Sequence, residues 1–123
     1  MCLGNACRSQ MAEGFARAYG SDVVVAVSAG VAPAVSVPAE TRRAMAEKNI
    51  DISEQFPKSL SLFPRGHFDL VVNMSGCPLA GFDAVREWRV IDPYGSSEKT
   101  YRAVRDQIEQ LVMSLIIELR RKK

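Results

Sequence analysis

Apolar residues recur at every third or fourth position in three stretches of the chain, which is the spacing of one face of a helix. The first stretch predicts a helix over residues 9–19, with Gly20 as its natural C-terminal stop. The second predicts a helix from Pro38, which suits a first turn, to about residue 49. The third predicts a long helix from about Glu98 onward. The apolar positions are Met11, Phe15 and Tyr19 in the first helix, Met45 in the second, and Tyr101, Val104, Ile108, Leu111, Leu115 and Leu119 in the third.

Short, continuous apolar runs lie between these helices and predict strands. Residues 23–27 form a β-branched run of the kind that is buried on both faces of a sheet, and residues 68–72 and 88–91 are further candidates. Strands that alternate with helices predict an α/β fold, a three-layer, doubly wound parallel sheet with helices on both faces. Such sheets bind ligands beyond the carboxyl ends of their strands, so we expect the site at a strand-to-helix loop.

Length and composition predict one globular domain, residues 1–123. Hydrophobic residues make up 47% and charged residues 24% of the chain, which excludes a disordered protein. The net charge of +2 is too small to indicate a nucleic-acid partner, and the basic residues 120–123 are interpreted as a solvated helix end. No apolar run approaches the roughly 20 residues that span a bilayer, so we expect no membrane partner.

The chain has three cysteines, an odd number that does not suit a secreted disulfide scaffold. Charged and polar residues begin within the first ten positions, so we expect no signal peptide. Both observations predict a cytoplasmic protein with reactive thiols. No zinc site is expected, because the chain has one histidine and no Cys-x-x-Cys pair.

Residues 2–9 have the pattern of a strand-to-helix loop with the chemistry of an anion cradle. Backbone N–H groups converge in such a loop, and the N-terminus of the next helix adds partial positive charge. Gly4 permits a backbone conformation that a residue with a Cβ would resist, and Arg8 can hold two oxygens of a tetrahedral oxyanion. The same field favours the thiolate of Cys2, to which Ser9 can donate a hydrogen bond. A chance Cys-x5-Arg spacing is the alternative, and the glycine and the following helix favour the functional interpretation.

The segment from Cys2 to Glu13 closely resembles the signature loop of the low-molecular-weight protein tyrosine phosphatase family, which includes the thioredoxin-coupled arsenate reductases. The resemblance spans nearly the whole chain. It implies the fold of that family and a cysteine-dependent hydrolase that requires no metal or cofactor, since the loop itself supplies the charge stabilisation. The other matching segments are residues 28–30, 50–53, 69–72, 92–95 and 101–106.

The resemblance also implies roles for single residues. Cys2 would be the nucleophile that takes the phosphoryl group as a thiophosphate, and Arg8 would bind the phosphate and stabilise its transition state. Asp92 would protonate the leaving oxygen and later activate water. Because Asp-Pro also starts turns, a purely structural Asp92 is the alternative. Asn5 would hold the shape of the loop and Ser9 would support the thiolate. The implied phosphate-binding residues are Leu3, Gly4, Asn5, Ala6, Cys7, Arg8 and Ser9.

Two activities fit this resemblance, because arsenate has the shape and charge of phosphate. The thioredoxin-coupled reductases carry two further cysteines on a short segment after the strand that resembles residues 70–73. Here that segment holds only Cys77, and Ser75 stands in place of the other cysteine. A two-thiol relay remains, in which Cys77 or Cys7 attacks an oxidised Cys2 and an external thiol-reductant protein completes the cycle. For Cys7, protection of Cys2 as a reversible disulfide and a plain packing role are further alternatives.

Other residues divide between the two activities. Residues 10–14 and 87–88 look more like the reductases, and Asn5, Glu13 and Ser28 resemble a potassium site found in some of them. Residues 92–94 look like those of the phosphatases. We rank a phosphatase acting on a phosphorylated protein or a small aryl phosphate first, and an arsenate reductase second.

Only Met1 precedes the candidate loop, so the strand that should lead into it is missing from this sequence. In the family that this chain resembles, the missing strand is central to the sheet. Its loss would leave backbone groups unpaired on two neighbours and anchor the nucleophile poorly. This motivates a third interpretation, an inactive oxyanion-binding module, and we expect low stability of the monomer. The gap would reflect truncation or be filled by a partner chain.

Overall fold

The computed structural model describes residues 1–2, 4–64, 66–79, 81–82 and 84–122. The three predicted helices are present, and the second ends earlier than expected because Asn49 adopts a positive φ of 60° in the turn that follows it. In chain order the elements of the described residues are α1 (Arg8–Tyr19), α2 (Ala39–Ala46), the 3-10 helix η1 (Leu60–Leu62), β1 (Val71–Asn73), β2 (Val85–Glu87) and α3 (Glu98–Arg121).

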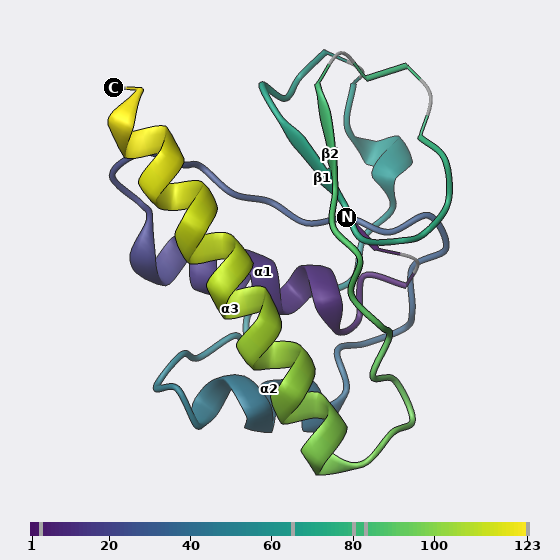
Figure 1. Ribbon diagram of the computed structural model, residues 1–123. Helices are drawn as coiled ribbons and strands as arrows, with labels where there is room; N and C mark the ends of the chain where they lie inside the picture. The colour runs from purple at the N-terminus through teal and green to yellow at the C-terminus, as the bar shows by residue number, and fades with distance from the viewer. Residues whose placement is uncertain (3, 65, 80, 83, 123) are drawn as a thin grey trace.

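α3 is the long helix that packs across both α1 and α2 (Figure 1). Ser97 caps it, because the Ser97 Oγ accepts a hydrogen bond from the Thr100 N–H at 3.3 Å. Gly20 permits close approach of the end of α1, since a Cβ there would lie 2.7 Å from the Ile116 side chain. The buried apolar residues of α3 are Tyr101, Val104, Ile108, Val112 and Ile116, whereas the predicted Leu111, Leu115 and Leu119 are half-buried at the edge of that face.

A parallel arrangement of backbone segments lies beside these helices. β1 pairs in parallel with β2. On the other side of β1, the Met1 amino group donates to the Val72 carbonyl at 2.7 Å, and the Met74 N–H donates to the Met1 carbonyl at 2.6 Å. Cys2 then forms a parallel bridge with Gly30. The fold is therefore the expected α/β type, and Cys2 lies at the centre of its parallel segments.

The strand predicted at residues 23–27 is wrong. No residue in the described part of the chain pairs with this segment in a ladder, and the Val25 side chain is 98% exposed. The physical reason is an open groove of about 450 Å³ between residues 23–29 and 68–72, where a neighbouring strand would have to lie. The strand predicted at 68–72 overlaps β1 only at its last two residues. The strand predicted at 88–91 is wrong, since the strand in this part of the chain is β2, which ends before residue 88.

The hydrophobic core lies where the three α-helices meet and continues up to the loop that follows Cys2. Both Cys2 and Cys7 belong to it, so the candidate loop is built on packed side chains. Among the helices that the structure describes, none has the length and apolar composition of a bilayer-spanning segment. The largest fully buried side chains include Phe15, Met11, Met45, Met74 and Ile108.

Candidate active site

The candidate loop leaves the parallel segments at Cys2 and enters α1 at Arg8. Its turn depends on Asn5, which is fully buried and has a φ of 51°. Asparagine tolerates this left-handed conformation when its side chain is hydrogen-bonded, and here the Asn5 Oδ1 accepts from the Lys58 backbone N–H at 2.9 Å. The Asn5 carbonyl also accepts from the Gln10 Nε2 at 2.8 Å.

The special backbone role expected for Gly4 was therefore wrong. Gly4 is not among the glycines with positive φ, and a Cβ added there would meet its neighbours only at ordinary distances of 3.9 Å or more. Asn5 makes the left-handed turn instead, because its amide can hydrogen-bond on both sides of the loop. The Gly4 carbonyl accepts from the Ala34 N–H at 2.8 Å, and Leu3 lies outside the described residues.

Cys2 is buried and its thiol lies 2.9 Å from the Ser9 Oγ. The Ser9 oxygen accepts a hydrogen bond from the Asn5 Nδ2 at 2.7 Å. Because that lone pair is occupied by Asn5, the Ser9 hydroxyl is free to direct its own proton toward the Cys2 sulfur. The Cys2 sulfur thus lies beside the Ser9 hydroxyl, on the loop that leads into the N-terminus of α1.

Arg8 is buried and ties three parts of the chain together. Its Nη1 donates to the Met74 carbonyl at 2.5 Å and to the Val90 carbonyl at 3.0 Å. Its Nη2 lies 3.7 Å from the Asp92 Oδ2. The Arg8 Nε has no hydrogen-bond partner among the described residues. A buried, unpartnered guanidinium N–H beside the nucleophile loop is the group that a tetrahedral oxyanion would satisfy.

Asp92 makes the contact expected of a turn starter and also lies near Arg8. Its Oδ1 accepts from the Tyr94 N–H at 3.0 Å, the contact of a turn starter. Its other oxygen faces Arg8, and the carboxyl group remains 46% exposed. The turn therefore places an accessible carboxyl group at the side of the loop, where a proton donor for a departing oxygen would be needed.

The two further cysteines lie in different environments. Cys7 is buried, accepts a hydrogen bond from the Thr41 Oγ1 at 3.3 Å and lies 3.6 Å from the Tyr101 hydroxyl. Burial raises the pKa of the Cys7 thiol above its usual value. Cys77 is exposed after β1, where its N–H donates to the Ser75 Oγ and its carbonyl accepts from the Asn73 Nδ2 at 2.8 Å.

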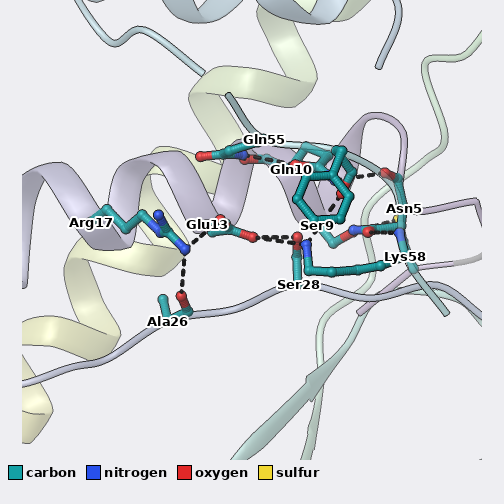
Figure 2. Close-up of polar contacts among 11 residues, drawn as sticks. Asn5, Ser9, Gln10, Glu13, Arg17, Ala26, Ser28, Gln55 and Lys58 are labelled. Atoms are coloured by element: carbon teal, nitrogen blue, oxygen red, sulfur yellow. Dashed lines mark hydrogen bonds and ion pairs between the residues drawn. The ribbon is translucent and has the colours of Figure 1, made fainter. Parts of the chain in front are cut away.

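A polar cluster behind the loop was only partly anticipated from the sequence. Ser28 donates to the buried carboxylate of Glu13 at 2.6 Å, and the Lys58 ammonium lies 3.7 Å from the same oxygen (Figure 2). The resemblance drew attention to Glu13 and Ser28 but not to Lys58. No local motif could have revealed Lys58, because it lies 53 residues from the Asn5 that it contacts.

Comparison with known proteins gives a consistent result. The whole chain, residues 1–123, matches the family model described as low molecular weight phosphotyrosine protein phosphatase. A glutaredoxin arsenate reductase from Synechocystis sp. is 32% identical, over 97% of this chain and 95% of that protein. An arsenate reductase from Shouchella clausii is 38% identical, over 88% of this chain and 86% of its own length.

Solved structures of both activities share the fold. An arsenate reductase in the phosphate binding state has a TM-score of 0.87 and 32% identity, over 96% of this chain and 94% of that one. A low molecular weight protein tyrosine phosphatase from T. tengcongensis has a TM-score of 0.79 and 30% identity, over 96% of this chain and 95% of that one. Both activities therefore occur on this scaffold, and arsenate reductase is the commoner name among the similar proteins.

Proposed function

Because this chain belongs to the low molecular weight phosphotyrosine protein phosphatase family, we propose that it is an arsenate reductase in which Cys2 is the nucleophile and Cys77 the second thiol. This reverses the order in which the sequence ranked the two activities. The names of the similar proteins support the reversal, and so does the exposed Cys77 thiol on the segment after β1. We propose arsenate as the oxyanion bound by the loop.

The observation that carries the proposal is the short connection between Cys77 and the nucleophile. The Met74 N–H is hydrogen-bonded to the Met1 carbonyl, directly beside Cys2, and the Met74 carbonyl is bound by Arg8. Cys77 follows Met74 by three residues, so its Cα can lie at most about 11 Å from that of Met74. The proposed relay requires a local rearrangement of this segment that brings the Cys77 thiol to Cys2.

The chemistry follows from these positions. The Cys2 thiolate attacks arsenic and displaces one oxygen as hydroxide or water, with Asp92 as the proton donor, which leaves a Cys2–S–As(V) adduct. The Cys77 thiolate then attacks the Cys2 sulfur. A Cys2–Cys77 disulfide forms, the S–As bond breaks, and its electron pair stays on arsenic, which leaves as As(III) arsenite. An external thiol reductant, two thiols per turnover, restores both cysteines.

Cys7 is a poorer second thiol than Cys77. It is buried and its sulfur accepts the Thr41 hydrogen bond, and burial raises its pKa, so its thiolate is disfavoured. These contacts support the packing role that the sequence analysis left open for Cys7.

Phosphomonoester hydrolysis is the second candidate, and Asp92 favours it. With the carboxyl group 3.7 Å from Arg8 and partly exposed, Asp92 is placed to protonate an aryl oxide leaving group and then to activate water against a Cys2 thiophosphate. An oxyanion-binding module without turnover is the third candidate, since the loop would bind phosphate in either case.

A side-by-side assay tests the proposal. Arsenite release with a thiol reductant and hydrolysis of an aryl phosphate are measured for the parent chain and for Cys2→Ser, Cys77→Ser, Cys7→Ser and Asp92→Ala. We expect arsenite release that is lost in Cys2→Ser and Cys77→Ser and persists in Cys7→Ser.

Other outcomes separate the remaining candidates. Aryl phosphate hydrolysis that survives Cys77→Ser and collapses in Asp92→Ala, with no arsenite release from the parent chain, would establish the phosphatase and overturn the reductase. Binding of inorganic phosphate with neither activity would leave the binding module.

A further inference from the structure

Glu13 is a buried carboxylate with two cationic neighbours. Its side chain is 3% exposed, and Ser28 donates to its Oε1 at 2.6 Å. Arg17 lies 3.0 Å from its Oε2 and the Lys58 Nζ 3.7 Å from its Oε1. A carboxylate this deeply buried requires a compensating charge and hydrogen bonds, and these two cations with Ser28 supply them.

Lys58 is the inner of the two cations. Its side chain is 13% exposed, compared with 58% for Arg17, and the two cations approach Glu13 from opposite sides (Figure 2). The Lys58 ammonium also donates to the Phe56 carbonyl at 3.2 Å and lies 5.0 Å from the centre of the Phe56 ring. The ammonium therefore lies close to two protein oxygens, the Glu13 Oε1 and the Phe56 carbonyl, and to the Phe56 ring, on the side of Glu13 that faces the candidate loop.

The backbone of Lys58 contacts the loop directly. Its N–H donates to the Asn5 Oδ1, and its carbonyl accepts from the Gly30 N–H at 2.8 Å, next to the bridge that holds Cys2. Asn5 in turn donates to Ser9, and Ser9 lies against the Cys2 sulfur. A continuous series of polar contacts thus leads from Glu13 through Lys58 to the nucleophile.

We propose that Lys58 is a positioning residue of the oxyanion loop and that its ammonium is a built-in monovalent cation for Glu13. The ion pair holds residue 58 in the place where its N–H fixes Asn5, and Asn5 keeps Ser9 directed at Cys2. This inference rests on the proposed active centre but not on which oxyanion reaction follows. It implies that binding and turnover in the parent chain do not depend on which monovalent cation is present in solution.

A variant that lacks the Lys58 ammonium tests this role. Lys58→Met keeps the length of the side chain and leaves the Glu13 carboxylate and the Phe56 carbonyl around an uncharged position. A small free cation, ammonium or potassium, can take that position, whereas tetramethylammonium is too large for it. Lys122→Met is the matched control, because Lys122 is an exposed lysine that pairs with Glu118 at the far end of α3.

The test compares affinity for inorganic phosphate, and kcat and KM for arsenate, in chloride salts of tetramethylammonium, ammonium and potassium at one ionic strength. In tetramethylammonium we expect Lys58→Met to lose about tenfold or more in phosphate affinity and kcat, as for other residues that orient a ligand-binding group. Ammonium or potassium should restore most of that loss. The parent chain and Lys122→Met should behave alike in all three salts.

The inference is overturned if Lys58→Met keeps full phosphate affinity and kcat in tetramethylammonium. It is also overturned if Lys58→Met melts like the parent chain and neither ammonium nor potassium restores its phosphate affinity and kcat. If Lys58→Met does not fold, Glu13→Gln/Lys58→Met removes both charges, and it should fold and show no cation dependence. Failure of this double variant to fold also overturns the inference. If Lys58→Met binds phosphate in a cation-dependent way and the parent chain does not turn over arsenate, the proposed function is refuted and the role of Lys58 is supported.

Discussion

The open groove between residues 23–29 and 68–72 offers the sharpest test of how this fold is stabilised. Because Cys2 bridges Gly30 in parallel, five residues joined before Met1 would lie opposite residues 24–28 on one side and alongside β1 and the residues before it on the other. We consider an extended chain that carries Ile-Val-Val-Ile-Val at this position. It should form a strand that pairs on both edges and fills the groove.

The expected gain can be worked out from three contributions. About eight new backbone hydrogen bonds contribute roughly 1 kcal/mol each. Five buried β-branched side chains contribute about 2 kcal/mol each. Ordering five residues costs about 2 kcal/mol each in backbone and side-chain entropy. The balance is about 8 kcal/mol, and a compact unfolded chain reduces it to roughly 4–7 kcal/mol. For a domain of this size that raises the melting temperature by about 12 °C or more.

The Met1 amino group makes the stability of the folded chain depend on pH. Burial lowers its pKa to about 6, below the 8.0 of a free amino terminus. Between pH 6 and 8 the unfolded chain therefore binds a proton that the folded chain does not, so stability rises with pH across this window. At pH 6 and below the parent chain is less stable by about 2–3 kcal/mol than at pH 8. The extension replaces the amine with an amide, so its advantage should be larger at pH 6 than at pH 8.

Thermal denaturation followed by circular dichroism at pH 6 and pH 8 checks both expectations, with sedimentation to show that the samples are monomers. A Gly-Ser-Gly-Ser-Gly extension is the matched control, since it replaces the amine but buries no apolar surface. An unchanged melting temperature for the apolar extension would refute the argument, as would an equal gain from the Gly-Ser control. A parent monomer that already melts cooperatively at high temperature would contradict our expectation of low stability.

Three further predictions concern single positions. Gly20→Ala should lower the free energy of unfolding by about 1–3 kcal/mol in urea denaturation, because the new Cβ would lie 2.7 Å from the Ile116 side chain. Ile116→Val in the same chain should restore part of this loss, and additive effects of the two substitutions would contradict the contact. Arg8→Lys should weaken phosphate binding by at least about tenfold in calorimetry, because the lysine ammonium keeps the charge but lacks the planar pair of N–H donors of the guanidinium. An unchanged phosphate affinity would rule out a bidentate contact. Iodoacetamide should label Cys77 in the native protein and Cys7 only after unfolding, because Cys77 is exposed and Cys7 is buried. Mass spectrometry of the labelled peptides measures both, and labelling of Cys7 in the native protein would argue against its burial.

Local signals were enough to predict the helices and the candidate loop. The apolar spacing of α1 and α3 reflects the face that each buries, and that spacing is set by the helical repeat alone. The order Cys2, Asn5, Arg8, Ser9 lies within eight consecutive residues, so the geometry that joins the thiol, the hydroxyl and the helix start is largely a local property of the chain.

Only the tertiary structure decided which residues outside the loop serve it. A strand depends on hydrogen bonds to neighbours that are distant in sequence, so residues 23–27 could have the composition of a strand and still form none beside an open groove. The burial of Cys7 depends on Thr41 and Tyr101, which come from other helices. The contacts of Lys58 with Glu13 and Asn5 likewise arise when segments 45 and 53 residues apart pack together. The sequence by itself thus determined the candidate loop, because its contacts are short-range, and packing determined the thiol accessibility and the charge compensation around it.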